Sequence, residues 1–596
     1  MTARAKRAGT MGSGTTETGT AGAGTTGTGT TGTGSPAGAA EMAGALDMLL
    51  TQAALGPLRQ FFPGRPALRF ARALAGRPGL VASRARGLAA ELARIAGGTS
   101  GVAPAARDRR FADPAWAGNP LLRRVMQAYL AAGDTALGVV SETPLDWRDA
   151  ERVRFAVSNL VDALAPSNSP LLSPEAWKAA VDSGGGSLVT GARHLLTDLS
   201  SAPRVPAMVP PDAYTVGTDL AATPGAVVLR TPLFELIQYR PSTDTVRELP
   251  VLIVPPTINK YYVLDLAPGR SLIEYLVSQG QQVFVMSWRN PDARHASWGF
   301  DAYAQAIVEA LEAAAAICAA PAVHLLGACS GGILASLAAA VRQAGAAPGA
   351  QPRVASLGLL VTMLDQSRTD AVGALMDEST AEAAIAASAR KGYLDGRSLA
   401  EVFAWLRPND LIWNYWVNNY LQGREPARFD ILFWNADTTR MTAGLHRDFV
   451  RAALSNSVTS PGGLTVLGTE VDLGQVDLDS YVVAGVADHI CPWQSCYRSS
   501  QLLGGKTRFV LSSSGHIAAL VNPPGGKKSR YQASDDVTAD AQAWQQSAAT
   551  EQGSWWPDYA SWLAARSGGQ VAAPAGLGGD GYRVIEPAPG SYVRAA

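Results

Sequence analysis

Residues 323–332 read VHLLGACSGG and set Cys329 at a turn between two apolar stretches. The run VHLLGA has the length and composition of a strand buried in a sheet, and the apolar residues after the turn are typical of a helix. Gly327 and Gly331 flank the cysteine and leave space for a tight turn. The stretch therefore predicts a strand, a sharp turn and a helix, with Cys329 at the turn.

Strand-like runs alternate with helical stretches on both sides of this turn. The expected strands lie at 226–241 (a pair), 249–256, 281–288, 323–328, 357–364, 479–488 and 507–515. The expected helices among them lie at 270–280 and 301–318. This alternation predicts an α/β fold with a doubly wound, mostly parallel sheet.

A thiol at such a turn matches the nucleophile elbow of the α/β-hydrolase fold, in which an acid and then a histidine follow the nucleophile, each after a strand. Asp488 follows the run SYVVA and His516 follows TRFVL, so Cys329, Asp488 and His516 occur in the required order. His489 is a competing base, but it adjoins Asp488 and its side chain should point elsewhere. His324 lies within a buried strand and is interpreted as a core histidine.

The motif alone is weak, because a free cysteine is often a buried core residue. A cysteine nucleophile suits acyl transfer between thioesters, because one thioester replaces another. A metal site is not expected, since no C-x-x-C is present and Cys491 and Cys496 lack nearby ligands at zinc spacing. No P-loop or G-x-G-x-x-G follows a strand, so no nucleotide cofactor is expected.

Composition narrows the class of protein. The 596 residues are 47% hydrophobic and 17% charged, which excludes a disordered chain. The 50 basic and 50 acidic residues balance, so a nucleic-acid partner is not expected. Four cysteines and no export signal indicate a cytoplasmic protein. Residues 313–341 lack charged side chains, but Pro321 and the glycine cluster argue against a transmembrane span.

The chain divides into four expected parts. Residues 1–40 form a disordered Gly/Thr-rich tail. Residues 41–107 form a basic helical arm, either lying on an apolar or anionic surface or forming a helical pair with solvated arginines. Residues 108–225 form a mainly helical N-terminal domain, in which the folded body begins near Phe111. Residues 226–596 form the catalytic domain, with an aromatic helical cap insertion at about 366–450 and an irregular tail after about 566.

Several blocks of sequence resemble those of the single-subunit polyhydroxyalkanoate synthases. They are FADPAWAGNPLLRR (111–124), PPTINKYYVLDLAPGRSL (255–272), SWRNPD (287–292), WGFDAYA (298–304), LRPNDLIWNYWVNNYL (406–421), FDILFWNADTTR (429–440), ADHICPW (487–493) and SSGHIAALVNPPG (513–525). The resemblance covers roughly four-fifths of the chain and implies an α/β-hydrolase fold with a helical cap.

It also implies that the protein polymerises (R)-3-hydroxyacyl-CoA into polyester and releases coenzyme A without a cofactor. Cys329 would carry the acyl group as a thioester, and His516 would deprotonate Cys329. Asp488 would orient His516 or help to activate the 3-hydroxyl of the monomer. The backbone amides of Ser330 and Ile258 would form the oxyanion hole. The implied partners are the growing polyester, the granule surface in the cytoplasm and a second copy of the chain in a homodimer.

The chain departs from the family pattern at residues 1–107, which have no counterpart and whose use in granule targeting is a hypothesis. Cys491 follows the acid where the family more often has another small residue, and is interpreted as a bystander. The box GACSGG resembles medium-chain synthases, whereas the length resembles the short-chain group. The alternatives are a cysteine hydrolase acting on esters or thioesters, of depolymerase or thioesterase type, and a catalytically silent granule-coat protein.

Overall fold

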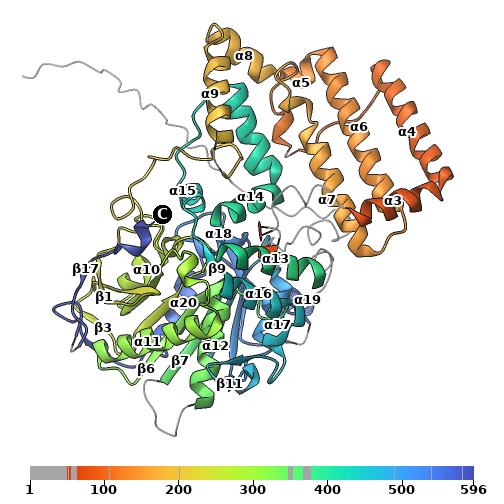
Figure 1. The fold of residues 1–596 in the computed structure, drawn as a ribbon. Helices are drawn as coiled ribbons and strands as arrows, with labels where there is room; N and C mark the ends of the chain where they lie inside the picture. The colour runs from red at the N-terminus through yellow and green to blue at the C-terminus, as the bar shows by residue number, and fades with distance from the viewer. Residues whose placement is uncertain are drawn as a thin grey trace, which may run out of the picture. The chain divides into compact units, whose positions relative to one another are not determined.

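A computed structural model describes residues 50–51, 53–54, 64–106, 108–200, 202–345, 353–366, 378–488, 490–538, 540–579 and 581–595 (Figure 1). The predicted tail at 1–40 lies outside the described residues, as does His489. Among the helices formed by the described residues, none is long and apolar enough to cross a membrane.

An eleven-stranded sheet lies at the centre of the described chain, in the order β15-β14-β13-β12-β7-β6-β4-β5-β2-β1-β17. Its strands are β1 (Gly225–Arg230), β2 (Phe234–Tyr239), β4 (Val251–Val254), β5 (Val283–Trp288), β6 (Ala322–Ala328), β7 (Arg353–Leu360), β12 (Ser480–Gly485), β13 (Thr507–Ser512), β14 (Arg530–Ser534), β15 (Ala549–Gln552) and β17 (Glu586–Pro587). The run from β5 to β13 is parallel throughout, which confirms the predicted sheet. Both edges are antiparallel, and β14, β15 and β17 were not predicted.

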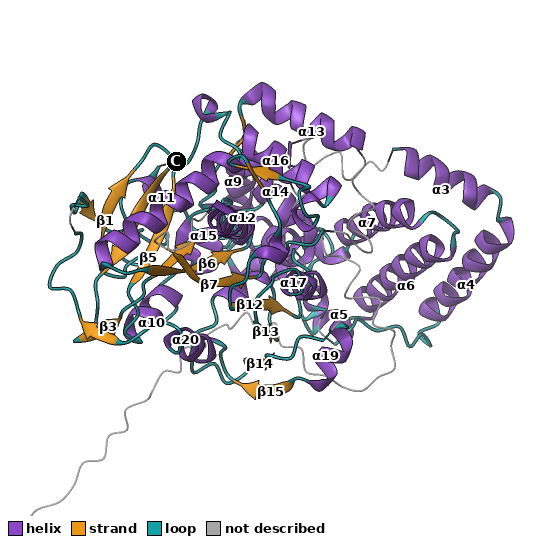
Figure 2. Ribbon diagram, turned by 90° about the horizontal axis from the view of Figure 1, so that it is seen from below, coloured by secondary structure: helices purple, strands orange, loops and turns teal. Residues whose placement is uncertain are grey.

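Two apolar cores lie on the two faces of the sheet because successive side chains of a strand point to opposite sides. Leu252 and Val254 pack with α11 (Phe300–Cys318) and α12 (Ser330–Gly345). Val251 and Ile253 pack with α10 (Leu272–Ser278) and α20 (Trp556–Ala564). Figure 2 shows these two pairs of helices on opposite sides of the strands. Strands buried on both faces explain the continuous apolar runs in the sequence.

The cap insertion is helical, as predicted, and contacts the N-terminal helices. It contains α13 (Glu378–Lys391), α14 (Gly396–Leu406), α15 (Asp430–Ala436), α16 (Ala443–Ser455) and the π-helical turns η6 (Asn409–Trp413) and η7 (Trp416–Leu421). In η7, Trp416 Nε1 donates to the carbonyl of Asn168 at 3.1 Å, and the Tyr420 hydroxyl donates to Asp198 at 2.7 Å. These cap aromatics therefore pack between the cap and the N-terminal helices.

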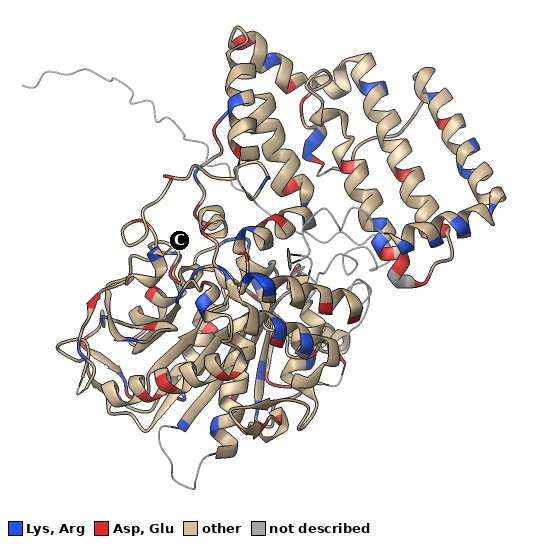
Figure 3. Ribbon diagram, in the orientation of Figure 1, with Lys and Arg blue, Asp and Glu red and all other residues tan. Residues whose placement is uncertain are grey.

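The N-terminal part is helical from before Phe111. Its helices are α3 (Arg65–Ala75), α4 (Pro78–Ala96), α5 (Ala115–Gly118), α6 (Pro120–Glu142), α7 (Trp147–Ala163), α8 (Pro174–Asp182) and α9 (Gly186–Ser200). Helix α4 packs against α6 and α3 against α7. Arg69 pairs with Asp149 at 2.8 Å, and Arg84 pairs with Glu142. The described part of the basic arm is thus a packed helical pair, and Figure 3 shows basic positions along α3 and α4.

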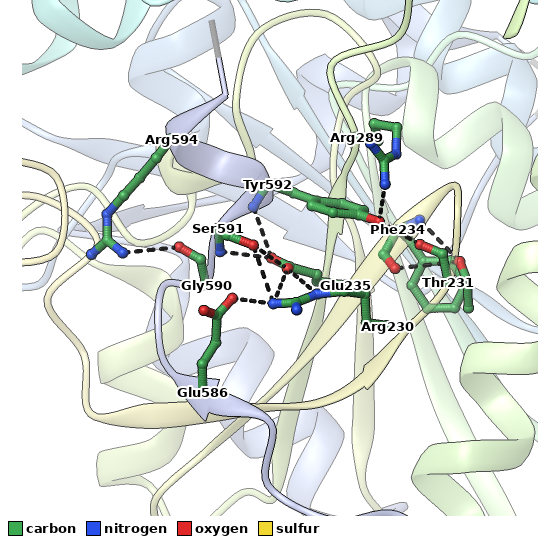
Figure 4. A network of polar contacts seen from close by, with 10 residues as sticks. All are labelled: Arg230, Thr231, Phe234, Glu235, Arg289, Glu586, Gly590, Ser591, Tyr592 and Arg594. Atoms are coloured by element: carbon green, nitrogen blue, oxygen red, sulfur yellow. Dashed lines mark hydrogen bonds and ion pairs between the residues drawn. The ribbon is translucent and has the colours of Figure 1, made fainter. Parts of the chain in front are cut away.

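The C-terminal tail is fastened to the sheet around a buried carboxylate, although its composition predicted irregular structure. Strand β17 pairs with β1, and Figure 4 shows the contacts that follow it. Glu235 accepts hydrogen bonds from the backbone amides of Ser591 and Tyr592 at 3.1 and 3.0 Å. It also accepts from the Ser591 hydroxyl at 2.9 Å and from Arg230 at 2.8 Å. Glu235 is completely buried, so these donors satisfy a charge that would otherwise destabilise the fold.

We expect Glu235→Ala to lower the free energy of unfolding by about 3 kcal/mol, because it leaves the backbone amides of Ser591 and Tyr592 without their acceptor and removes the buried partner of Arg230. Urea unfolding followed by tryptophan fluorescence measures the change. Glu586→Ala is the control, since Glu586 contacts the same Arg230 from the surface and its loss should cost less than about 1 kcal/mol. Equal effects of the two substitutions would contradict this account of the tail.

Candidate active site

Cys329 lies at a strained turn between β6 and α12. Its φ of 51° is in the left-handed region, which costs a non-glycine residue roughly 1–2 kcal/mol. The turn is held by hydrogen bonds from the Cys329 amide to the carbonyl of Leu360 at 2.8 Å and from the Gly332 amide to the carbonyl of Cys329 at 2.9 Å. Neighbouring strand and helix therefore enforce a conformation that the cysteine alone would avoid, as the elbow motif predicted.

The glycines of the motif are required by close packing around this turn. A Cβ on Gly331 would lie 2.2 Å from the carbonyl oxygen of Pro255, at the end of β4. A Cβ on Gly332 would lie 2.0 Å from Oγ1 of Thr362, and one on Gly327 would lie 2.5 Å from Cα of Gly332. The helix that begins at Ser330 can approach the carboxyl ends of its neighbouring strands only because these side chains are absent.

Asp488 and His516 meet beside the turn. Asp488 follows β12, and its Oδ1 accepts the amides of Ile490 and Cys491, both at 2.8 Å. Its Oδ2 lies 2.7 Å from Nδ1 of His516, which begins α18 (His516–Leu520) after β13. Strands β6, β12 and β13 are parallel, so their carboxyl ends bring all three predicted residues to one edge of the sheet. Cys329, Asp488 and His516 are all buried.

A second thiol lies at the site, which the sequence did not reveal. The Sγ atoms of Cys329 and Cys491 and a ring nitrogen of His516 all lie within 4.8 Å of one another. Cys491 lacks ligands nearby in the sequence, as stated above, but in the structure its neighbours come from loops that are remote in sequence. The only sequence signal was its position three residues after Asp488, in the loop that holds the acid.

The surroundings shift the pKa values of this cluster in opposite directions. A hydrogen bond with the Cys491 thiol lowers the pKa of Cys329, whereas burial raises it. The charge of His516 lowers it further, and the resulting pKa of Cys329 is about 5. Burial alone would lower the pKa of His516, but the charges of Asp488 and Cys329 raise it to about 10. The contact with Cys329 and burial raise the pKa of Cys491 well above its usual range. These shifts favour a Cys329 thiolate paired with a His516 imidazolium, beside a neutral Cys491 thiol.

We expect alkylation of Cys329 by iodoacetamide to have a midpoint near pH 5, because only the thiolate reacts and its fraction grows as the pH rises through the Cys329 pKa of about 5. Below the midpoint the rate should fall about tenfold per pH unit. Mass spectrometry of the Cys329 peptide measures the rate at each pH. In His516→Gln the midpoint should move up toward about 8.5, the ordinary thiol value. A wild-type midpoint already near 8.5 would refute the thiolate–imidazolium pair.

The predicted oxyanion loop is tied to the elbow by a side chain. The Thr257 amide donates to Oγ of Ser330 at 2.9 Å, and the two hydroxyl oxygens lie 3.0 Å apart. This places the loop containing Ile258 against the start of α12. Lys260, at the end of the loop, donates to the carbonyls of Val593 and Ala595 at 2.8 and 2.5 Å. The elbow and the C-terminal tail thus fix the loop from both sides.

His324 is a core residue, as expected from its place in β6. Its Nδ1 lies 2.7 Å from Oγ of Ser356, and its Nε2 lies 3.2 Å from Oγ of Ser567. Burial lowers the pKa of His324 to about 4. His324 is therefore a neutral, fully bonded side chain with no part in the cluster around Cys329.

Comparison with known proteins gives two family matches and several relatives. Residues 107–276 match the family described as "Poly-beta-hydroxybutyrate polymerase (PhaC) N-terminus", and residues 250–523 match the alpha/beta hydrolase fold. Poly(3-hydroxyalkanoate) polymerase 2 of Ectopseudomonas oleovorans is 47% identical over 506 residues, which cover 85% of this chain and 90% of that protein. The poly(3-hydroxyalkanoate) polymerase subunit PhaC of Cupriavidus necator is 42% identical over 495 residues, covering 82% and 83%.

Similar solved structures include a monoacylglycerol lipase from Paleococcus ferrophilus, with 12% identity and a TM-score of 0.29 over 56% of this chain and 99% of that chain. A hydrolase from Pseudomonas aeruginosa PA01 has 13% identity and a TM-score of 0.31 over 50% and 92%.

Proposed function

This chain belongs to the poly(3-hydroxyalkanoate) polymerase family of acyltransferases, and we propose that it polymerises (R)-3-hydroxyacyl-CoA through a thioester on Cys329 and releases coenzyme A. The observation that carries the proposal is the buried cluster in which Cys329 sits at the strained turn beside His516, itself bound to Asp488 at 2.7 Å. Its residue types and their order along the chain are those of a nucleophile, an orienting acid and a base.

Acylation begins from the thiolate–imidazolium pair. The Cys329 sulfur attacks the thioester carbonyl of the substrate, and the backbone amides of Ser330 and Ile258 stabilise the developing oxyanion. The bond from the carbonyl carbon to the coenzyme A sulfur then breaks. His516 gives its proton to the leaving thiolate, which leaves a neutral imidazole and an acyl group on Cys329.

Elongation uses the neutral imidazole as a base. His516 takes the proton of a 3-hydroxyl group, the resulting oxygen nucleophile attacks the thioester on Cys329, and an ester forms as the sulfur leaves as thiolate. Both oxygens of Asp488 are already engaged, Oδ1 by two backbone amides and Oδ2 by His516. We therefore assign to Asp488 the orientation of His516 rather than contact with the substrate hydroxyl. These steps need no cofactor beyond the coenzyme A carried by the substrate.

Product analysis tests the proposed function. The whole chain is incubated with (R)-3-hydroxybutyryl-CoA or (R)-3-hydroxyoctanoyl-CoA, and both thiol release and the acyl product are measured. We expect coenzyme A release together with insoluble polyester, and the faster of the two substrates gives the preferred monomer length. Release together with free hydroxy acid would instead identify a thioesterase-type hydrolase.

We propose that an exposed apolar surface on α8 and α9 binds the surface of the polyester granule. It consists of Trp177, Val181, Leu188, Val189, Leu196 and Leu199, each at least half exposed. A growing aliphatic polyester is apolar and is tethered to the enzyme through Cys329, so contact with it would remove this surface from water. Val189 and Leu196 also line a shallow hollow in the surface, together with Arg193 and Ser200.

Sedimentation with polyester granules tests this surface. Val189→Asp combined with Leu196→Asp should release the protein from granules while coenzyme A release from soluble substrate continues. Leu68→Asp, at a similarly exposed position on α3, is the control and should leave sedimentation unchanged. Unchanged sedimentation of the double variant would refute the role of this surface in granule binding.

We also propose a homodimer in the cytoplasm, which analytical ultracentrifugation of the whole chain tests.

A further inference from the structure

The neighbourhood of Cys329 contains three donors that bind soft metal ions. The two sulfurs of Cys329 and Cys491 and a ring nitrogen of His516 lie within 4.8 Å of one another, and all three residues are buried. In a tetrahedral zinc site with two thiolates and one imidazole, the ligand atoms are roughly 3.5–4 Å apart, given bonds of about 2.0–2.3 Å. Small side-chain rotations therefore suffice to bring these donors to one ion.

The residues that position these three donors resemble those that support the ligands of a zinc site. Nδ1 of His516 is held by Asp488 at 2.7 Å, which leaves Nε2 for a metal, and carboxylate–histidine pairs of this kind orient zinc ligands. The amide of Cys491 donates to the same carboxylate at 2.8 Å, and the Cys496 thiol donates to the carbonyl of Cys491 at 3.8 Å. The loop that carries Cys491 is thus anchored next to the histidine.

We propose that Cys329, Cys491 and His516 form a binding site for a thiophilic divalent ion, Zn²⁺, whose occupation switches off the polymerase. Two sulfurs and one nitrogen leave the fourth tetrahedral position to water, and they disfavour Mg²⁺ and Ca²⁺, which take oxygen ligands. Binding releases the proton of the Cys491 thiol and the Nε2 proton of His516 to solvent. The metal is then bound to the Cys329 sulfur, which can no longer attack the substrate.

Cys491 is the residue that makes this site more than a catalytic pair. Cysteine and histidine alone offer two ligands, whereas Cys491 supplies the third and a second thiolate charge. Metal binding rests on the geometry of the cluster, while inhibition rests also on the proposed role of Cys329 as the nucleophile. Measuring the two separately distinguishes failure of one from failure of the other.

Competition against a chromogenic chelator tests the site directly in metal-free wild-type protein, Cys491→Val and Cys318→Ala. We expect one Zn²⁺ per wild-type chain and at least ~100-fold weaker binding to Cys491→Val, because even the loss of a group behind the ligands costs about 10–100-fold. Cys318→Ala should bind as wild type does, since Cys318 lies at the end of α11, bonded to Gln282. Cobalt(II) should give thiolate-to-metal charge-transfer absorption in wild type that is lost or weakened in Cys491→Val.

Each other result counts against the inference or against the function beneath it. Equal zinc affinity in wild type and Cys491→Val, or a wild-type cobalt spectrum without thiolate absorption, would overturn the metal site. Should Cys491→Val fail to fold by circular dichroism, Cys491→Ala takes its place in the same comparison. Zinc should stop coenzyme A release at one equivalent per chain, and a chelator should restore it. Cys491-dependent binding with undiminished release would keep the metal site but remove Cys329 as the nucleophile.

Discussion

Replacing Cys329 by alanine is expected to lower the rate of coenzyme A release from (R)-3-hydroxyacyl-CoA by at least ~10⁴-fold. The substitution removes the sulfur that we propose forms the acyl thioester, and loss of a nucleophile costs about as much as loss of a whole triad. The proposed oxyanion donors, the amides of Ser330 and Ile258, remain, so a small residual rate is expected. A thiol-reactive dye measures release over the first turnovers and at steady state.

Cys318→Ala is the matched control for this prediction. Cys318 is a half-buried thiol whose pKa is raised to about 12 by burial, and its sulfur donates to Gln282. Its loss should change release less than twofold, within the ~0.5 kcal/mol typical of substitutions away from such a site. A Cys329→Ala variant that releases coenzyme A within tenfold of the wild-type rate would show that another group carries out the attack.

Gly331→Ala is expected to lower coenzyme A release at least ~100-fold and the free energy of unfolding by about 3 kcal/mol. The added Cβ would meet the carbonyl oxygens of Pro255 and Val254 at 2.2 and 2.5 Å, and neither can move aside as a flexible side chain could. Overpacking of this kind costs about 1–3 kcal/mol. It also pushes the start of α12 away from β4, and a shift of about 1 Å at a reacting group costs roughly 100-fold in rate.

Gly87→Ala is the control that separates the steric clash in Gly331→Ala from the general effect of replacing a glycine by alanine. Gly87 lies within α4, and a Cβ there would meet no heavy atom within 4 Å beyond its chain neighbours and the backbone of its own helix. Gly87→Ala should therefore stabilise the chain by about 0.5–1 kcal/mol through helix propensity and leave release unchanged. Urea unfolding and the same release assay compare the two variants. Wild-type behaviour of Gly331→Ala would show that the turn does not need the close approach seen here.

The parts of the fold that could be predicted are those that depend on residues close together in the sequence. Apolar runs gave the parallel strands, and the glycines around Cys329 gave the turn, because each of these features depends on residues a few positions apart. The order of Cys329, Asp488 and His516 followed from the elbow, since parallel strands of one sheet end at the same edge. All three residues meet there.

Features that depend on remote contacts were not predictable in this way. The pairing of β17 with β1 involves two residues on each strand, and the carboxylate of Glu235 that fastens the tail is more than 350 positions away from it. Strand β14 is only partly buried and β15 is exposed, so both lack the apolar run that marks a central strand. Cys491 is 162 positions from Cys329, and only the sheet order brings the two loops together.

Detection of the acyl group on Cys329 tests the central claim most directly. Wild-type protein is mixed briefly with (R)-3-hydroxyacyl-CoA, quenched in acid and digested, and the peptides are analysed by mass spectrometry. The account predicts a hydroxyacyl thioester on the peptide that contains Cys329, removable by hydroxylamine. It also predicts accumulation of this species in His516→Gln if that variant still acylates, because elongation then lacks its base. An acyl group found on Cys491 or on another residue, with Cys329 unmodified, would contradict it.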